Sequence, residues 1–327
     1  MRKLTFKQAI SEAYEEELER DERVFVIGED IQKAWGGPLG DLQNLPDKFW
    51  ANKQIRPAPI SETAILGGAI GAAATGMRPV AFMHFCNFLG VCGDELLNQL
   101  SAMRYMYGGK AKLPLTIVAY SGGGVSAAAQ HSKCLEGFIM TIPGIKVVAP
   151  STPYDAKGLL KAAIRDDNPV MYFERTLLML KGIQGEVPEE EYIVPLGKAD
   201  IKRKGTDVTV VAIGTMVHRA LKAADDLQKQ GISLEVIDAR SLVPLDKTAI
   251  LDSVAKTGRL AIIDEEPKTG SAACTIASMV AEEGFNLLKK PIKLVCAPDT
   301  PVPFSAVMEK FWMPDEDNLI QAVTEIM

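Results

Sequence analysis

Short apolar runs alternate with longer amphipathic segments along this sequence, and that alternation restricts the fold more than any other feature. The apolar runs are 24–28, 79–85, 114–119, 145–150 and 170–174, then 208–213, 234–238, 260–264 and 292–295. The main helical patterns are 93–106, 216–230, 246–256 and 269–287. Strands that alternate with helices form parallel sheets covered on both faces. We therefore expect an α/β fold with two doubly wound, mostly parallel-sheet domains.

The best linker is the acidic, proline-bearing segment 186–191. A chain of 327 residues is long enough for two domains of ordinary size. We expect one α/β domain over 1–185, a linker over 186–200 and a second α/β domain over 201–327.

Composition excludes several classes of function. The net charge of -6, with no basic stripe, argues against nucleic acid as a partner. The most apolar run, 64–77, is too short to cross a bilayer. The start of the chain turns polar too early for a signal peptide. Five widely spread cysteines without a C-x-x-C pair are typical of reduced thiols, so we expect a cytoplasmic protein without a membrane partner.

Familiar cofactor and metal motifs are missing from the sequence. It has no G-x-G-x-x-G after a strand, no GK[ST] phosphate loop and no H-E-x-x-H pair. The chain therefore lacks a phosphate anchor of its own.

Pro59-Ile60-Ser61-Glu62 delivers a carboxylate to the head of a helix. Ser61 is the expected N-cap, with its hydroxyl accepting an amide hydrogen of the first turn. The residues that follow Glu62 are small or apolar. From the residues alone, Glu62 is either a surface charge that complements the helix dipole or a buried acid with a raised pKa.

The three histidines differ in their surroundings. His84 lies in an expected strand and His218 opens an expected helix, so both are interpreted as structural. His131 follows a glycine-rich loop, which is a setting that presents an imidazole for proton transfer, although a structural role remains equally open. Glu29 and Asp30 follow the run 24–28, at the end of a strand where ligands gather in α/β sheets.

A set of short stretches is spread over nearly the whole chain. The stretches are 59–62, 130–132, 143–148, 150–159, 195–199, 237–240, 244–246 and 299–303. In combination they resemble the β subunit of the thiamine-diphosphate-dependent component of 2-oxo acid dehydrogenase complexes. Within that family, 88–92, 104–111 and 127–132 are most similar to acetoin dehydrogenase β subunits.

The resemblance implies a role for each matching residue in a shared cofactor site. Glu62 matches the glutamate that bonds to the pyrimidine ring of thiamine diphosphate. Ile60 lines the same pocket and Phe88 packs on the pyrimidine. His131 matches the histidine that faces the thiazolium ring and the substrate, so Glu62 and His131 are the implied catalytic residues.

The resemblance also implies ions and partners. The family holds a monovalent cation, commonly potassium, and the matching residues are Leu115, Ala163, Ile164, Asp166 and Asn168. A plain surface turn is the alternative interpretation of 166–169. Magnesium is expected on a partner α subunit, in a heterotetramer of two α and two β chains that works with a lipoyl acyltransferase core.

The implied activity is cleavage of acetoin, with the acetyl unit passed to a lipoyl group. A pyruvate or branched-chain 2-oxo acid dehydrogenase β subunit is the alternative enzyme, and a non-catalytic scaffold is the alternative from another class. The sequence departs from the family at Pro57-Ala58, at Lys133 beside His131, and at 270–274. The last departure concerns contacts with a subunit or the core more than catalysis.

Overall fold

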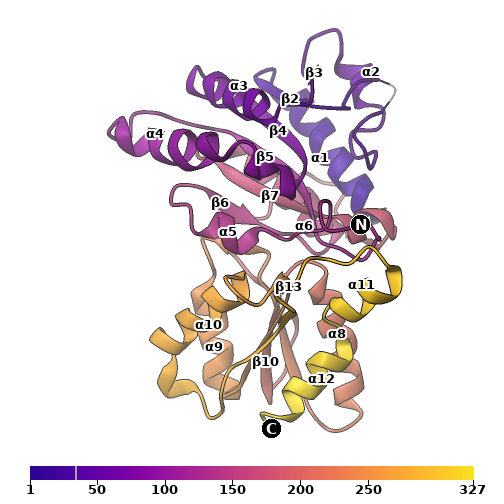
Figure 1. Cartoon of the computed structure of the whole chain (residues 1–327), viewed down its shortest axis with the longest axis vertical. Coiled ribbons are helices and arrows are strands. Elements are labelled where there is room, and N and C mark those ends of the chain that lie inside the picture. Colours follow the sequence, from indigo (N-terminus) through magenta and orange to yellow (C-terminus); the bar gives the residue numbers. More distant parts are fainter. Residues whose placement is uncertain (34) are drawn as a thin grey trace. The chain divides into compact units, whose positions relative to one another are not determined.

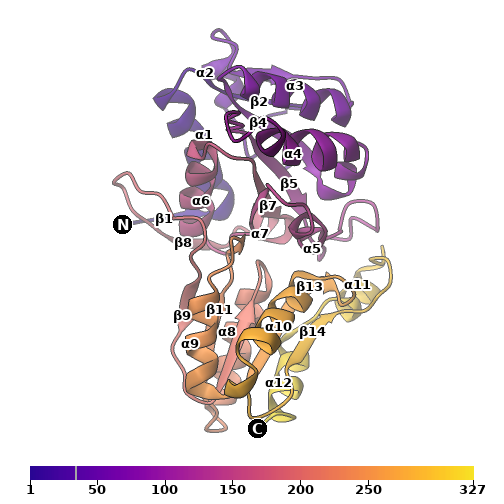
Figure 2. The ribbon, with the colours of Figure 1, turned by 90° about the vertical axis from the view of Figure 1, so that its left-hand side faces the viewer.

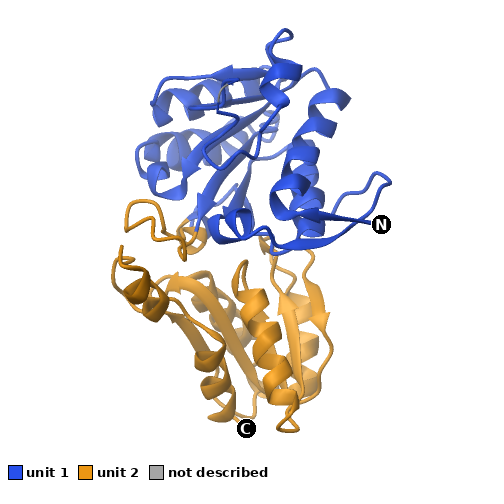
Figure 3. Cartoon of the chain, turned by 90° about the vertical axis from the view of Figure 1, so that its right-hand side faces the viewer, with its two compact units in different colours: residues 1–121, 139–196 blue, residues 122–138, 197–327 orange. Residues whose placement is uncertain are grey.

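The computed structural model describes residues 1–33 and 35–327, which divide into two compact units (Figure 3). The first unit contains residues 1–121 and 139–196, and the second contains 122–138 and 197–327. No feature of the sequence pattern had separated 122–138 from its neighbours. The expected domain limits around 186–200 stay a prediction.

The first unit is built on a parallel sheet in the order β6-β7-β5-β4-β2-β3 (Figure 1). The strands are β2 (Val24–Gly28), β3 (Ile55–Pro57), β4 (Arg78–Phe85), β5 (Thr116–Ser121), β6 (Lys146–Val148) and β7 (Val170–Arg175). β5 and β7 are buried along their whole length, which explains why their sequences do not alternate apolar and polar residues. A separate antiparallel pair joins β1 (Arg2–Thr5) to β8 (Gln184–Val187).

Helices accompany this sheet. They are α1 (Phe6–Arg20), α2 (Leu45–Phe49), α3 (Glu62–Ala74), α4 (Ser101–Met106), α6 (Pro153–Arg165) and α7 (Thr176–Leu180), while α5 (Glu136–Met140) lies where the two units divide. A 3₁₀-helix spans Cys86–Gly90 and a π-helix spans Glu95–Leu100. The helix expected over 93–106 is therefore two consecutive pieces, a π-helical turn followed by α4.

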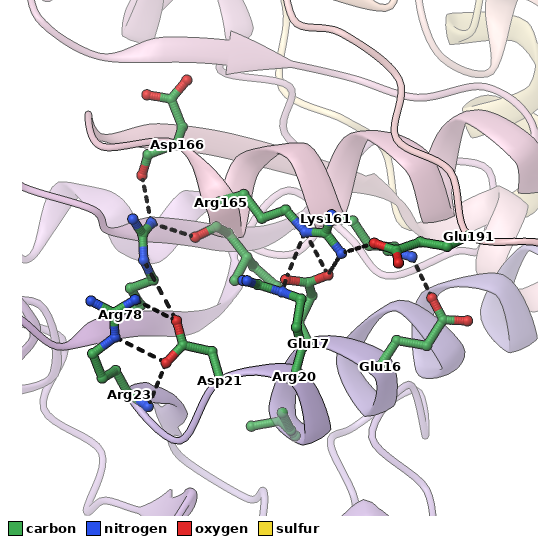
Figure 4. Close-up of polar contacts among 12 residues, drawn as sticks. Glu16, Glu17, Arg20, Asp21, Arg23, Arg78, Lys161, Arg165, Asp166 and Glu191 are labelled. Atoms are coloured by element: carbon green, nitrogen blue, oxygen red, sulfur yellow. Dashed lines mark hydrogen bonds and ion pairs between the residues drawn. The ribbon is translucent and has the colours of Figure 1, made fainter.

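α1 packs against α6 through apolar residues and a line of ion pairs (Figure 4). Lys157 and Lys161 are almost fully buried, and both ammonium groups bond to Glu16. Arg165 pairs with Glu17, whose carboxylate is fully buried. Removing one partner from such pairs leaves a buried charge uncompensated, so these contacts fix the alignment of the two helices.

The second unit contains a five-stranded sheet in the order β14-β13-β10-β11-β9, in which only β9 is antiparallel to its neighbour (Figure 2). The strands are β9 (Asp200–Arg203), β10 (Val208–Ala212), β11 (Leu234–Asp238), β13 (Leu260–Pro267) and β14 (Lys293–Ala297), with β12 (Ser241–Val243) outside this sheet. The helices are α8 (Met216–Gln228), α9 (Lys247–Thr257), α10 (Ala272–Glu283), α11 (Ala306–Trp312) and α12 (Glu316–Thr324), and a 3₁₀-turn spans Phe285–Leu287.

The α/β class and the two largely parallel sheets are confirmed. Local signals were accurate where capping chemistry was strong. Thr5 and Gln8 form a capping box at the start of α1, and Thr152 caps α6 with Pro153 at its first position. None of the helices in the described part of the chain has the length and apolar character needed to span a bilayer.

Candidate functional site

The loop that carries Glu62 is tied to the carboxyl end of β2. The Ala58 N–H donates to the Gly28 carbonyl at 2.8 Å, and α3 begins at Glu62. Ser61 occupies the N-cap position, but the expected capping bond is wrong because its side chain makes none. Its dihedral angles, φ -164° and ψ 86°, fall outside the β-region geometry usual for a capping side chain.

Ile60 and Glu62, two positions apart in this loop, differ in their exposure to solvent. Glu62 is half-buried, and the apolar Ile60 side chain is 79% exposed.

Phe88 lies in the 3₁₀-helix that follows β4, half-buried and edge-on to Phe85 at 6.2 Å. The Thr63 hydroxyl on α3 donates to the Val91 carbonyl at 3.2 Å, which links this segment to the start of α3. Burial raises the pKa of the nearby Cys92 thiol to about 12, and the charges of Glu95 and Glu62 add to that effect. The structure therefore brings the segments of Ile60, Glu62 and Phe88 together.

Sequence reasoning did not connect His84 with Glu29, whose pKa is affected by the charge of Glu62. His84, interpreted as structural, points its Nδ1 at the Glu29 carboxylate at 2.8 Å and its Nε2 at the Glu29 carbonyl at 3.0 Å. Burial raises the pKa of Glu29, the Glu62 and Asp30 charges raise it further, and His84 opposes them. The position of Glu29 and Asp30 at a strand end was the one signal for this pair.

His131 belongs to the second unit, in the loop that follows Gly122. This loop is strained, because Ser126 and Ala128 adopt positive φ values of 56° and 60°. Its amides are held by a buried glutamate: Glu309 accepts from the Gly124 and Ser126 N–H groups, each at 2.8 Å. Nothing in the sequence links Glu309, which lies far along the chain, to the His131 loop.

The residues matched to a cation site cluster around the turn after α6. The carbonyl oxygens of Ile164 and Asp166 accept from the Arg78 guanidinium at 3.0 and 3.1 Å (Figure 4). The Leu115 carbonyl accepts from Val170 N–H. The carbonyl oxygens of Leu115, Ile164 and Asp166 each keep a second lone pair. A cation bound to the Ile164 and Asp166 oxygens would lie near the positive charge of Arg78.

The two remaining residues of this set complete the turn. The Ala163 carbonyl accepts from the Asp166 N–H at 3.2 Å, and the Asn168 amide groups bond to the Asp166 carboxylate. Hydrogen bonds to Lys146 and Asn168 outweigh burial and lower the pKa of Asp166. Within residues 1–33 and 35–327, no cluster of three or more histidine, cysteine or acidic side chains is arranged to hold a metal.

Comparison with known proteins identifies the two halves of the chain. Residues 2–179 match the family model "Transketolase, pyrimidine binding domain", and residues 197–319 match "Transketolase, C-terminal domain". A solved structure described as "Split gene transketolase, inactive beta4 tetramer" covers 99% of this chain and 98% of its own, with TM-score 0.82 and 22% identity. That structural likeness shows the fold alone.

Curated relatives give the family. The chain is 47% identical to acetoin:2,6-dichlorophenolindophenol oxidoreductase subunit beta of Bacillus subtilis, covering 100% of this chain and 98% of the relative. It belongs to this family of dehydrogenase β subunits. The counterpart from Cupriavidus necator is also 47% identical, with the same coverage. The 2-oxoisovalerate dehydrogenase subunit beta of Bacillus subtilis is 41% identical over 99% of this chain and 98% of its own length.

Proposed function

We propose that this chain is the β subunit of a thiamine-diphosphate-dependent acetoin dehydrogenase, which cleaves acetoin and passes the acetyl unit to a lipoyl group. The observation that carries the proposal is 47% identity over the full length to two acetoin oxidoreductase β subunits, against 41% to the 2-oxoisovalerate relative. Acetoin is neutral, so its site would need no cation to hold a carboxylate.

The residues around Glu62 fit an aromatic ring that carries a hydrogen-bonding nitrogen. Ile60 and Phe88 supply apolar walls, and the Glu62 carboxyl at the head of α3 holds a proton at the pyrimidine ring nitrogen. When bound, thiamine diphosphate supplies the carbon nucleophile. A carboxyl group suits this task because it can both donate a proton to a ring nitrogen and take it back.

His131 is the proposed acid or base toward the substrate. The strained loop presents its half-buried ring, and two backbone amides fix that loop to Glu309. His131→Ala is expected to slow turnover by about 100-fold, the usual loss for a positioned acid or base.

The site is shared with an α subunit, which is proposed to hold the diphosphate and magnesium in a heterotetramer of two α and two β chains. The support is the missing phosphate-binding motif in this sequence. The purified chain alone is expected not to bind thiamine diphosphate tightly. Micromolar binding in calorimetry without any partner would refute the shared site.

A monovalent cation, commonly potassium, is proposed at the residues that match the family's cation site, which are Leu115, Ala163, Ile164, Asp166 and Asn168. Its test is the melting temperature of the α/β complex in potassium chloride and in choline chloride at equal ionic strength. A higher melting temperature in potassium supports the site, and identical values reject it. A lipoyl acyltransferase core and a cytoplasmic location complete the proposal.

Steady-state kinetics of the α/β pair with a dye acceptor test the substrate. The specificity constant for acetoin is expected to exceed those for pyruvate and 2-oxoisovalerate. A larger constant for either oxo acid would instead support a 2-oxo acid dehydrogenase, which the 41% identical relative represents. The absence of turnover on all three substrates by a folded complex would favour the scaffold alternative.

A further inference from the structure

The loop that carries His131 is held at its backbone amides by buried glutamates of its own unit. This loop, residues 122–135, leads into α5, and the glutamates lie far along the chain, on β13 and α11. Glu265, Glu266 and Glu309 are each 4% exposed or less. The proposed chemistry uses His131 but gives none of these three carboxyl groups a part in the reaction.

Glu309 accepts from the start of the loop with both carboxyl oxygens. Its Oε1 accepts from the Gly124 N–H and its Oε2 from the Ser126 N–H, each at 2.8 Å. Gly124 has a φ of 88° and Ser126 a φ of 56°, and left-handed residues of this kind turn nearby amide groups toward one acceptor. A single carboxyl group therefore fixes two amides that lie two positions apart.

Two neighbouring residues of β13 hold the flanks of the same loop. The Glu265 Oε1 accepts from the Gly123 N–H at 2.5 Å. Glu266 accepts at 3.0 Å from the Gly137 N–H, in the first turn of α5 directly after the loop. The backbone is thus attached to carboxyl groups on both sides of His131.

Bonds within the loop carry this restraint to His131. The Gly122 N–H donates to the Lys133 carbonyl at 3.0 Å, which closes the base of the loop, and the His131 N–H donates to the Ala128 carbonyl at 3.4 Å. Ala128 has a φ of 60°, a strained conformation for a residue other than glycine. Such a conformation persists only where surrounding contacts fix it, and the amide bonds to the glutamates are contacts of that kind.

We propose that the three glutamates position the His131 ring toward the substrate, with Glu309 as the main anchor. All three are positioning residues, because they bond to the backbone of the loop and none is assigned to touch substrate or cofactor. The consequence for turnover rests on the proposed function of His131, whereas the attachment of the loop is a property of this chain.

A double-mutant cycle in the reconstituted α/β complex tests this role. Glu309→Gln turns an NH₂ group toward one of the two amide N–H groups, so it is expected to loosen the loop and lower kcat for acetoin by about 10-fold. In a His131→Ala background the same change is expected to lower kcat by less than about 2-fold, because no ring is left to misplace. An equal fold-change in both backgrounds would overturn the proposal.

Two further measurements separate positioning from a general loss of stability. Exchange of the thiazolium proton in Glu309→Gln is expected to stay within about 2-fold of wild type, because that step is assigned to Glu62 and not to His131. The matched control is Ser253→Ala, which removes a buried bond between the Ser253 and Thr209 hydroxyls, 2.7 Å apart, in the same unit. This control is expected to keep the wild-type kcat, and a loss as large as that of Glu309→Gln would contradict a positioning role.

Ala128→Gly is the second variant, in case Glu309→Gln does not fold. Glycine adopts a φ of 60° without strain, so the amide bonds remain while the loop becomes less restricted. It is expected to lower kcat about 3-fold in the wild type and to have no effect in the His131→Ala background. An unchanged kcat in the wild-type background would count against the proposal.

Hydrogen exchange followed by mass spectrometry on the purified chain tests the attachment without cofactor or turnover. At short exchange times, Glu309→Gln is expected to speed amide exchange by about 10-fold or more in peptides from the loop, while peptides from the buried strand β10 stay protected. Wild-type exchange in the loop would refute the attachment and with it the proposal. Wild-type turnover by His131→Ala would instead place the failure in the proposed function, and hydrogen exchange would still decide whether the glutamates hold the loop.

Discussion

Two buried acids of the first unit differ from Glu309 of the second unit in how their oxygens are satisfied. Glu309 accepts from two backbone amides of the His131 loop. In the first unit, both oxygens of the fully buried Glu174 lack a hydrogen-bond partner among the described residues. Asp41, also fully buried, accepts from the Tyr120 hydroxyl with one oxygen, while its other oxygen has no partner among the described residues.

The difference separates two uses of a buried carboxyl group. An acid whose oxygens accept backbone amides holds loops together and belongs to the framework. An acid without such donors is stable when it keeps a proton, and burial together with the Asp41 charge raises the pKa of Glu174 well above its usual range. Glu62 is only half-buried, and its carboxyl makes no hydrogen bond in the described part of the chain.

The same substitution should therefore give opposite results in the two units. Glu309→Gln replaces a charged acceptor of two amides with a neutral amide and is expected to cost about 2 to 3 kcal/mol in the free energy of unfolding. Urea denaturation of the purified chain measures it. A cost below about 0.5 kcal/mol would show that Glu309 is not a framework acid.

Glu174→Gln is the matched variant in the first unit. Because Glu174 is held neutral, its neutral isostere is expected to change the free energy of unfolding at pH 7 by about 1 kcal/mol or less, and toward greater stability. A loss as large as that of Glu309→Gln would contradict the distinction between the two units.

The contribution of Asp41 to the free energy of unfolding depends on pH. Burial raises its pKa to about 6 from an ordinary value of 3.8, against the opposing hydrogen bond from Tyr120. The folded state then binds more protons than the unfolded state, so stability is greatest below about pH 4 and falls as the pH rises through about 6. Asp41→Asn should flatten this fall by on the order of 1 kcal/mol, measured by denaturation at pH 4 to 7.

The contribution of Glu316, in the second unit, to the free energy of unfolding is expected to change with pH in the opposite direction. Its bonds to Lys222 and Arg219 overcome burial and lower its pKa to about 2 from 4.5. Its contribution is present above about pH 4.5 and is lost as the pH falls toward 2. Because the pair with Lys222 is partly solvated, Glu316→Gln should cost about 0.5 kcal/mol at pH 7 and less at pH 3.

The sequence predicted the fold well because the patterns that indicate strands and helices involve residues close together in the chain. Apolar runs defined strands such as β2 and β11 to the residue. It failed for short edge strands such as β9, which is only partly buried and carries Lys202 and Arg203. These strands exist because a neighbouring strand supplies hydrogen bonds, which a local pattern does not reveal.

The resemblance supplied the roles of the site residues, and those roles stay predictions. The segments of Ile60, Glu62 and Phe88 are linked by the Thr63–Val91 hydrogen bond. The His84–Glu29 contact depends on a close approach at Gly28 and a bulge in β4, and both arise from sheet pairing between distant segments. The spacing of residues along the chain does not predict this close approach or this bulge.

Exchange of the thiazolium proton in the reconstituted α/β complex tests the central claim, that Glu62 is an acid kept without structural partners so that it can serve the cofactor. Glu62→Gln is expected to slow exchange by about 100-fold or more while the fold survives. The reason is that an amide cannot transfer a proton to or from the pyrimidine nitrogen as a carboxyl group can. His131→Ala should leave exchange nearly intact. Wild-type exchange in Glu62→Gln would contradict the account.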